Sequence, residues 1–150
     1  MEPDNLVNAA DVRRAEAVAM SEKRLQDAIT QAARGTGWYV YHTHIAKRSA
    51  EGYPDLTMAN DRLTRHLWVE LKREMKEGRR PTLTSTQVDV LNILAGVHQE
   101  VYLWLPRDWT SGAIATALTA ARPLEDTAVC NTLWAHRRDR LEELDVRVAR

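Results

Sequence analysis

The 150-residue chain contains a single cysteine, Cys130, and no excess of charge of either sign. One cysteine excludes a disulfide within the chain and a zinc site built from several cysteines, and it fits a reducing compartment. Lysine and arginine together number 21, as do aspartate and glutamate, so the formal net charge is zero. This balance argues against a protein that binds nucleic acid through overall positive charge, and any basic surface must be local.

The sequence also lacks targeting and membrane segments. No apolar run approaches the length of a transmembrane helix, and the run Met1–Asp4 lacks the basic and apolar regions of a signal peptide. There is no internal repeat or low-complexity tract. We therefore expect a soluble cytoplasmic protein of one domain, with no membrane association and no small-molecule cofactor.

Hydrophobic patterning predicts an α/β fold. The expected elements are a helix from Ser21 to about Arg34, strands near 38–44, 56–58, 67–72 and 100–105, and a helix from Thr84 to Gly96. The tight connection at 60–62 makes the second and third strands an antiparallel hairpin, and the helical crossover favours a parallel fourth strand. Because residues 100–105 are almost all apolar, we expect this strand in the centre of the sheet, covered on both faces.

The two ends of the chain are expected to lie outside the core. We assign residues 1–20 to an N-terminal extension that is helical from Asp11, 21–109 to the core, and 110–150 to a C-terminal helical extension. Helices are predicted at 111–121 and from about Leu124 to Val148. The second has mixed charges, which are typical of a solvated helix face. A structural or regulatory protein that binds a partner through this extension is one alternative function class.

A candidate metal site is indicated by the run Gly52–Asp55 and by Glu70-Leu71-Lys72 further along the chain. The glycine and the proline of the first run make a turn that directs Asp55 to the start of a strand. Side chains alternate along a strand, so Glu70 and Lys72 share one face of the next. Two carboxylates and a lysine beside a sheet can hold a divalent metal ion and orient a water molecule.

Each candidate residue also has a structural explanation. Asp55 could cap its own turn, and Lys72 could form a surface ion pair that contributes under ~1 kcal/mol. Glu22 stands in the first turn of its helix, where the helix dipole alone favours a carboxylate, although its spacing from the apolar helix positions turns it inward. Gln87 stands three residues after a threonine, as a capping box requires.

Basic residues are concentrated in one part of the chain. Between Arg62 and Arg80, seven lysines and arginines stand against three acidic residues, and the loop before Gly52 adds two more basic residues. Side chains of this kind bind the phosphate groups of nucleic acids. The candidate nucleic-acid-binding residues are Lys47, Arg48, Arg73, Lys76, Arg79 and Arg80.

These motifs together resemble a known superfamily. The helix with Glu22, Gly-x-Pro-Asp at 52–55, Val-Glu-Leu-Lys at 69–72 and Gln87 at the start of a helix resemble the PD-(D/E)XK nucleases. Within that superfamily they are most similar to the VRR-NUC domain, especially its small stand-alone versions in bacteriophages. The resemblance covers roughly residues 21–109. It implies a restriction-endonuclease-like core with a mixed central sheet flanked by helices, and the host-cell cytoplasm for a phage-encoded protein.

The resemblance also implies an activity and the roles of single residues. The activity is that of a Mg²⁺-dependent endodeoxyribonuclease similar to a four-way (Holliday) junction resolvase, acting on DNA as a homodimer. The implied metal ligands, for Mg²⁺ or Mn²⁺, are Asp55, Glu70, the carbonyl of Leu71, and Glu22. The implied catalytic residues are Asp55, Glu70, Lys72 and Gln87. The alternatives are a catalytically silent nucleic-acid-binding module, or a nuclease acting on flaps, single strands or ordinary duplex DNA.

Overall fold

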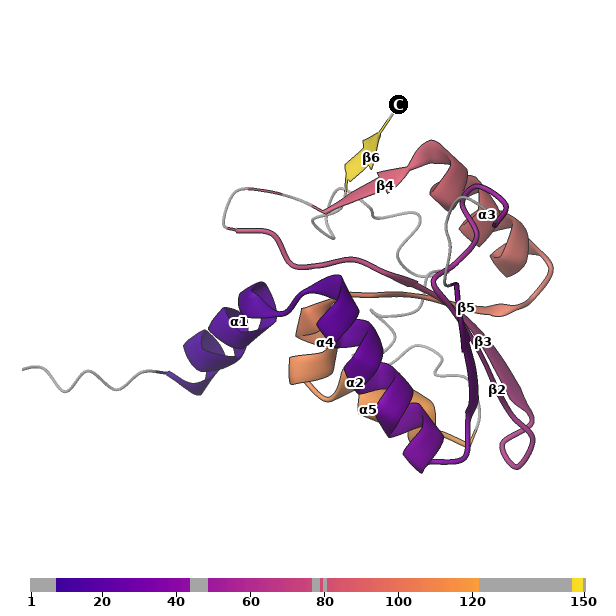
Figure 1. Cartoon of the computed structure of the whole chain (residues 1–150), viewed down its shortest axis with the longest axis horizontal. Helices are drawn as coiled ribbons and strands as arrows, with labels where there is room; N and C mark the ends of the chain where they lie inside the picture. Colours follow the sequence, from indigo (N-terminus) through magenta and orange to yellow (C-terminus); the bar gives the residue numbers. More distant parts are fainter. Residues whose placement is uncertain (1–7, 44–48, 77–78, 80, 122–146, 150) are drawn as a thin grey trace, which may run out of the picture.

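The fold is a mixed β-sheet flanked by helices (Figure 1). The computed structural model describes residues 8–43, 49–76, 79, 81–121 and 147–149. The elements, in chain order, are α1 (Ala9–Ala19), α2 (Glu22–Gly35), β1 (Tyr39–His42), β2 (Leu56–Asn60), β3 (Arg65–Leu71), β4 (Thr82–Thr84), α3 (Ser85–Gly96), β5 (Glu100–Trp104), α4 (Pro106–Thr110), α5 (Ala113–Thr119) and β6 (Arg147–Ala149). This architecture confirms the predicted α/β fold class. Within the described ranges, no helix combines the length and apolar character needed to cross a bilayer.

The main sheet has the strand order β1-β2-β3-β5. β2 is antiparallel to both β1 and β3, whereas β5 is parallel to β3. The predicted hairpin and the predicted parallel crossover are therefore confirmed. The expectation that β5 lies in the centre of the sheet was wrong for the described part of the chain, in which β5 is the last strand of this order.

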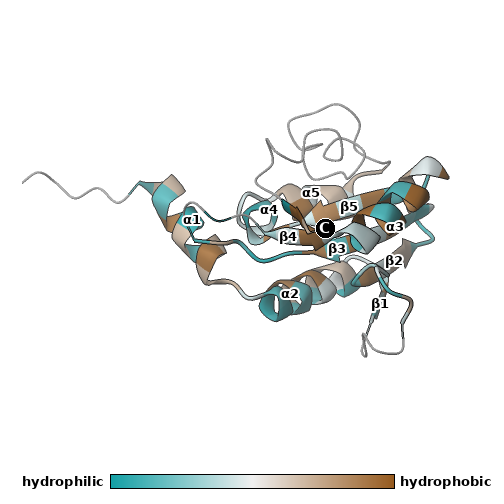
Figure 2. Ribbon diagram, turned by 90° about the horizontal axis from the view of Figure 1, so that it is seen from above, coloured by the Kyte–Doolittle hydropathy of each residue, from teal (hydrophilic) through white to brown (hydrophobic). Residues whose placement is uncertain are grey.

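Helices cover both faces of the sheet, which explains why an edge strand is almost entirely apolar. On one face, the side chains of Leu67, Val69 and Leu71 pack with α2 and α5 in the larger hydrophobic core. On the other face, α3 covers Val101 and Leu103 of β5 in a smaller core (Figure 1). In the view coloured by hydropathy, the apolar segments are concentrated in the sheet and in the helices against it (Figure 2). Burial on both faces produces the continuous apolar run, and it does not require a central position.

Several element boundaries differ from the prediction. β4 was not predicted, and it pairs in parallel with β6, where Leu83 lies opposite Val148. Val148 is therefore in a strand and not in the predicted helix, most of which lies outside the described residues. A pairing between segments so far apart in the sequence leaves no local signal. The helix predicted at 111–121 corresponds to α5, whereas α4 was not predicted, and Gly112, with a φ of +83°, lies between the two.

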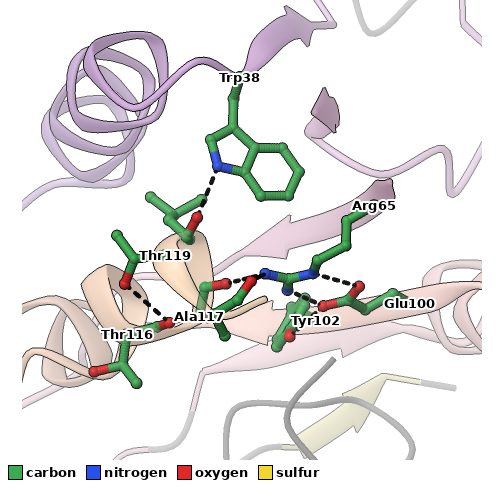
Figure 3. Close-up of polar contacts among 9 residues, drawn as sticks. Trp38, Arg65, Glu100, Tyr102, Thr116, Ala117 and Thr119 are labelled. Carbon is green, nitrogen blue, oxygen red and sulfur yellow. Dashed lines mark hydrogen bonds and ion pairs between the residues drawn. The ribbon is translucent and has the colours of Figure 1, made fainter. Parts of the chain in front are cut away.

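Arg65 belongs to a buried polar network and not to the basic surface (Figure 3). Its guanidinium pairs with Glu100 and donates to the carbonyl oxygens of Ala117 and Ala120 at 2.6 and 2.8 Å. The hydroxyl of Tyr102 donates to the same Glu100 carboxylate at 2.6 Å. This network ties β3 and β5 to α5, whose apolar residues lie in the larger core. The domain boundary at residue 109 remains a prediction.

Candidate active site

The candidate site lies at the end of the sheet where β2 begins and β3 ends. The two strands are antiparallel and Leu56 pairs with Val69, so the neighbouring residues Asp55 and Glu70 come to the same end. Oδ2 of Asp55 accepts a hydrogen bond from the backbone N–H of Leu71 at 2.8 Å. The two halves of the sequence motif are therefore joined directly.

Glu70 is a buried carboxylate with one oxygen left without a partner. Its side chain is 2% exposed, and Oε1 lies 2.6 Å from Nε2 of Gln87 and 3.5 Å from Nζ of Lys72. Oε2 is buried and has no hydrogen-bond partner among the described residues. Burial and the charge of Asp55 together raise the pKa of Glu70 to about 8, although the charge of Lys72 lowers it. A buried carboxylate in this state needs a proton or a cation.

Two further carboxylates interact with the same lysine. Burial raises the pKa of Asp55, whereas the hydrogen bond from Leu71 and the charge of Lys72 lower it. Glu22 stays exposed at the start of α2, so it does not turn into the core as its spacing predicted. Partial burial of its carboxylate still raises the pKa of Glu22, which Lys72 lowers and Asp55 raises. Glu22 therefore lies at the rim of the site.

A cavity of about 320 Å³ opens beside these carboxylates, between the start of α2 and the ends of β1, β2 and β3. Glu70 is not among the residues that line it. The cavity is lined by Glu22, Lys23, Gln26, His42, Thr43, Asp55 and Leu71. Sequence reasoning missed Gln26, although its position four residues after Glu22 places both on one side of the helix. Lys23 and Thr43 were also missed, and their positions gave no comparable signal.

Gln87 takes part in a helix cap and in the site at once. Its Oε1 accepts from the N–H of Thr84 at 2.9 Å, and its own N–H donates to the hydroxyl oxygen of Thr84 at 3.1 Å. This is the predicted capping box at the start of α3. The remaining Nε2 group donates to Glu70. The predicted capping box is therefore confirmed, and Gln87 also contacts Glu70, while a catalytic role of Gln87 remains a prediction.

The turn before Asp55 depends on Gly52. Its φ is +80°, and a Cβ at this position would lie 2.6 Å from the carbonyl oxygen of Thr86 in the first turn of α3. In the same contact, the hydroxyl of Thr86 donates to Glu51 at 3.3 Å. The turn is thus packed against the helical turn that carries Gln87. A glycine is required here because both the dihedral angle and the close backbone contact exclude a side chain.

We expect Gly52→Ala to lower the free energy of unfolding by about 2 kcal/mol or more, because a left-handed conformation alone costs roughly 1–2 kcal/mol for alanine. Gly35→Ala is the matched control, since a Cβ there meets no atom within 4 Å. That change, at a helical position, should be neutral or stabilising by up to ~1 kcal/mol. Urea unfolding measures both variants, and equal stabilities would contradict this role for Gly52.

The predicted nucleic-acid-binding residues fall into different environments. Arg73 is exposed and close enough to Glu22 to lower its pKa. Lys76 and Arg79 are exposed and line another cavity, next to α1. Lys47, Arg48 and Arg80 lie outside the described residues.

The donor atoms at this site fit a hard divalent cation. Mg²⁺ prefers oxygen ligands and is usually held by one or two carboxylates together with water and substrate phosphates. Asp55 supplies one such carboxylate, and Glu70 supplies another whose Oε2 is unpartnered. In the described part of the chain, however, no three side chains of His, Cys, Asp or Glu form a ready ligand set. Water and a phosphate would have to complete the coordination.

Comparisons with known proteins give one structural similarity. No family model matches the chain, and no curated protein matches it. Among solved structures, the chain is similar to Hjc, a Holliday junction resolvase from the archaeal hyperthermophile Archaeoglobus fulgidus, with 21% sequence identity and a TM-score of 0.40. The similarity covers 53% of this chain and 63% of Hjc, so the chain matches less than two thirds of that protein.

Proposed function

We propose that this protein is a Mg²⁺-dependent endodeoxyribonuclease of the PD-(D/E)XK superfamily, similar to the VRR-NUC domains of bacteriophages. The observation that carries the proposal is the buried Glu70, whose unpartnered oxygen lies in a cluster with Asp55 and Lys72. Burying carboxylates beside one another destabilises a fold, so such a group is typical of a functional site. Hydrolysis of a phosphodiester uses this combination of carboxylates and a lysine.

Asp55 and Glu70 are the proposed ligands of the metal ion. Glu22, at the rim of the site, and the carbonyl of Leu71 complete the protein's share of the coordination. When bound, the ion supplies Lewis-acid stabilisation of the charge that develops on the scissile phosphate. Mn²⁺ should replace Mg²⁺, because both take carboxylate and carbonyl oxygens.

Lys72 and Gln87 act on either side of Glu70. The ammonium of Lys72, 3.5 Å from the carboxylate, orients the attacking water and offsets negative charge in the transition state. Gln87 donates to Oε1 at 2.6 Å and so holds the carboxylate in one orientation, which leaves Oε2 for the cation. Since its other amide atom is held by the cap of α3, the position of Gln87 is fixed by the helix.

The proposed substrate is branched DNA, with a four-way junction as the leading structure and a homodimer as the active form. Two sites related by a two-fold axis match the two-fold symmetry of such a junction. Exposed basic residues, among them Arg73, bind the backbone, so that binding should weaken steeply as salt rises.

The test is a panel of labelled DNAs, comprising a four-way junction, a flap, a single strand and a plain duplex, each with Mg²⁺ or Mn²⁺. The proposal predicts metal-dependent cleavage, with the junction preferred and cut in symmetrical pairs. Preferential cleavage of another DNA in the panel would support the proposed nuclease activity and identify a different substrate. Binding of these DNAs without cleavage under either ion would instead indicate the silent binding module.

A further inference from the structure

A second, strongly basic cavity lies between α1, the segment that follows β3, and α4. Its volume is about 430 Å³, and its charged lining residues are Arg13, Arg14, Glu74, Lys76, Arg79 and Arg107. Five positive charges and one negative charge therefore surround a single cavity, in a chain whose net charge is zero. We infer that this cavity binds phosphate groups of the nucleic-acid strand on which the active site acts.

Glu74 holds one of the arginines in place. The carboxylate is buried and accepts hydrogen bonds from Nε of Arg107 at 2.5 Å and from Nη2 at 2.8 Å. A two-point pair of this kind fixes the plane of the guanidinium. The Arg107 side chain is still 46% exposed, so it remains accessible from the cavity. Glu74, the one acidic residue of the lining, is thus paired with the guanidinium of Arg107 and orients it.

α1 supplies two of the five cations, although it lies outside the predicted nuclease core. Ala17 is the one residue of this helix, within the described chain, that is buried, so burial of apolar surface contributes little to its position. α1 nevertheless lies beside α4 (Figures 1 and 2), and Arg13 and Arg14 line the cavity. The position of this helix beside α4 thus brings two arginines to the cavity. Guanidinium groups match the oxygens of a phosphate in pairs, so several of them around one cavity favour this ligand.

Some residues that line this cavity follow the candidate active-site residues directly in the sequence. Lys72 lies beside Glu70, and Glu74 and Lys76 of the following segment line the cavity. The four residues from Lys72 to Lys76 span at most about 14 Å. A DNA strand cleaved at the active site would therefore place a neighbouring phosphate within reach of the cavity. This step rests on the proposed function, whereas the phosphate chemistry follows from the charged lining.

The test is the binding of a fluorescein-labelled four-way junction, measured by anisotropy in EDTA over a series of salt concentrations. The full-length chain is compared with the double variant Arg13→Ala/Arg14→Ala. The matched control, Arg24→Ala/Arg34→Ala, removes the same charge from exposed positions of α2 that line neither this cavity nor the cavity of the candidate active site. The α1 variant should bind at least about 10-fold more weakly at low salt. The slope of log K against log[salt] should become shallower by about 1.8, which corresponds to two lost phosphate contacts, whereas the control keeps the wild-type slope.

The outcomes separate this inference from the proposed nuclease. Equal affinities and slopes for the two double variants, or no binding by the wild type, would overturn the inference whether or not the wild type cleaves DNA with Mg²⁺. A slope reduced in the α1 variant alone would support it even if no cleavage is found. Inorganic pyrophosphate is the probe for a small free anion. If pyrophosphate raises the melting temperature in the wild type but not in the α1 variant, and DNA binding is equal in both, the occupant is not a nucleic-acid strand.

Discussion

Glu70→Gln should reduce Mg²⁺-dependent cleavage by at least about 100-fold, the loss that follows removal of one electrostatic group from a reacting centre. The amide has the shape of the carboxylate and can still accept from Gln87, but it carries no negative charge for a metal ion. Burial and the charge of Asp55 already raise the pKa of Glu70 to about 8, so a neutral isostere should cost the fold little stability. Single-turnover cleavage of the preferred DNA measures the effect, with urea unfolding beside it.

Asp61→Asn is the matched control for this variant. Asp61 is an exposed carboxylate in the turn between β2 and β3, at the opposite end of the hairpin from Asp55. Its replacement removes the same charge and should leave the cleavage rate unchanged. If folded Glu70→Gln cleaves DNA at the wild-type rate, Glu70 is not an active-site residue and the proposed nuclease site is wrong.

Lys72→Met should also lower cleavage by at least about 100-fold, but for a different reason. Methionine keeps much of the apolar stem and removes the ammonium that lies 3.5 Å from Glu70. Because Lys72 lowers the pKa values of Asp55, Glu70 and Glu22, its positive charge also competes with a cation for these carboxylates. The variant should therefore retain metal binding, or bind more tightly, while it loses turnover.

This split between binding and turnover distinguishes a catalytic lysine from a structural one. Arg34→Met is the control, because Arg34 is an exposed cation at the far end of α2, roughly 18 Å along the helix axis from Glu22. Arg34→Met should change neither metal binding nor the rate of cleavage. If Lys72→Met loses metal binding and stability together, or if it cleaves as fast as the wild type, the catalytic role is wrong.

Local signals in the sequence were sufficient to predict the elements that carry the site. Ser21 caps α2, and Thr84 and Gln87 form the capping box of α3. Alternation along β3, continued to Lys72 directly after it, places Glu70 and Lys72 together. The turn at Gly52 was predicted from the glycine and the proline in the run Gly52–Asp55. Its close contact with Thr86 was not predictable, because that contact depends on how α3 packs against the sheet.

Features set by long-range packing could not be predicted in the same way. The pairing of β4 with β6 joins segments that are distant in the sequence. Arg65, one of the basic residues between Arg62 and Arg80, forms a buried ion pair with Glu100 and so has a structural role. Glu22 was expected to turn inward from its helical spacing. It is exposed because it occupies the first residue of α2, beyond the part of the helix that packs on the core.

The central claim is that Asp55 and Glu70 together hold a divalent cation, and calorimetric titration tests it most directly. Mn²⁺ or Mg²⁺ is titrated into the metal-free wild-type protein, with Glu70→Gln and Asp61→Asn measured in parallel. We predict saturable binding to the wild type and to Asp61→Asn, and its loss in Glu70→Gln. An absence of binding to the wild type, or equal binding to all three proteins, would contradict the claim.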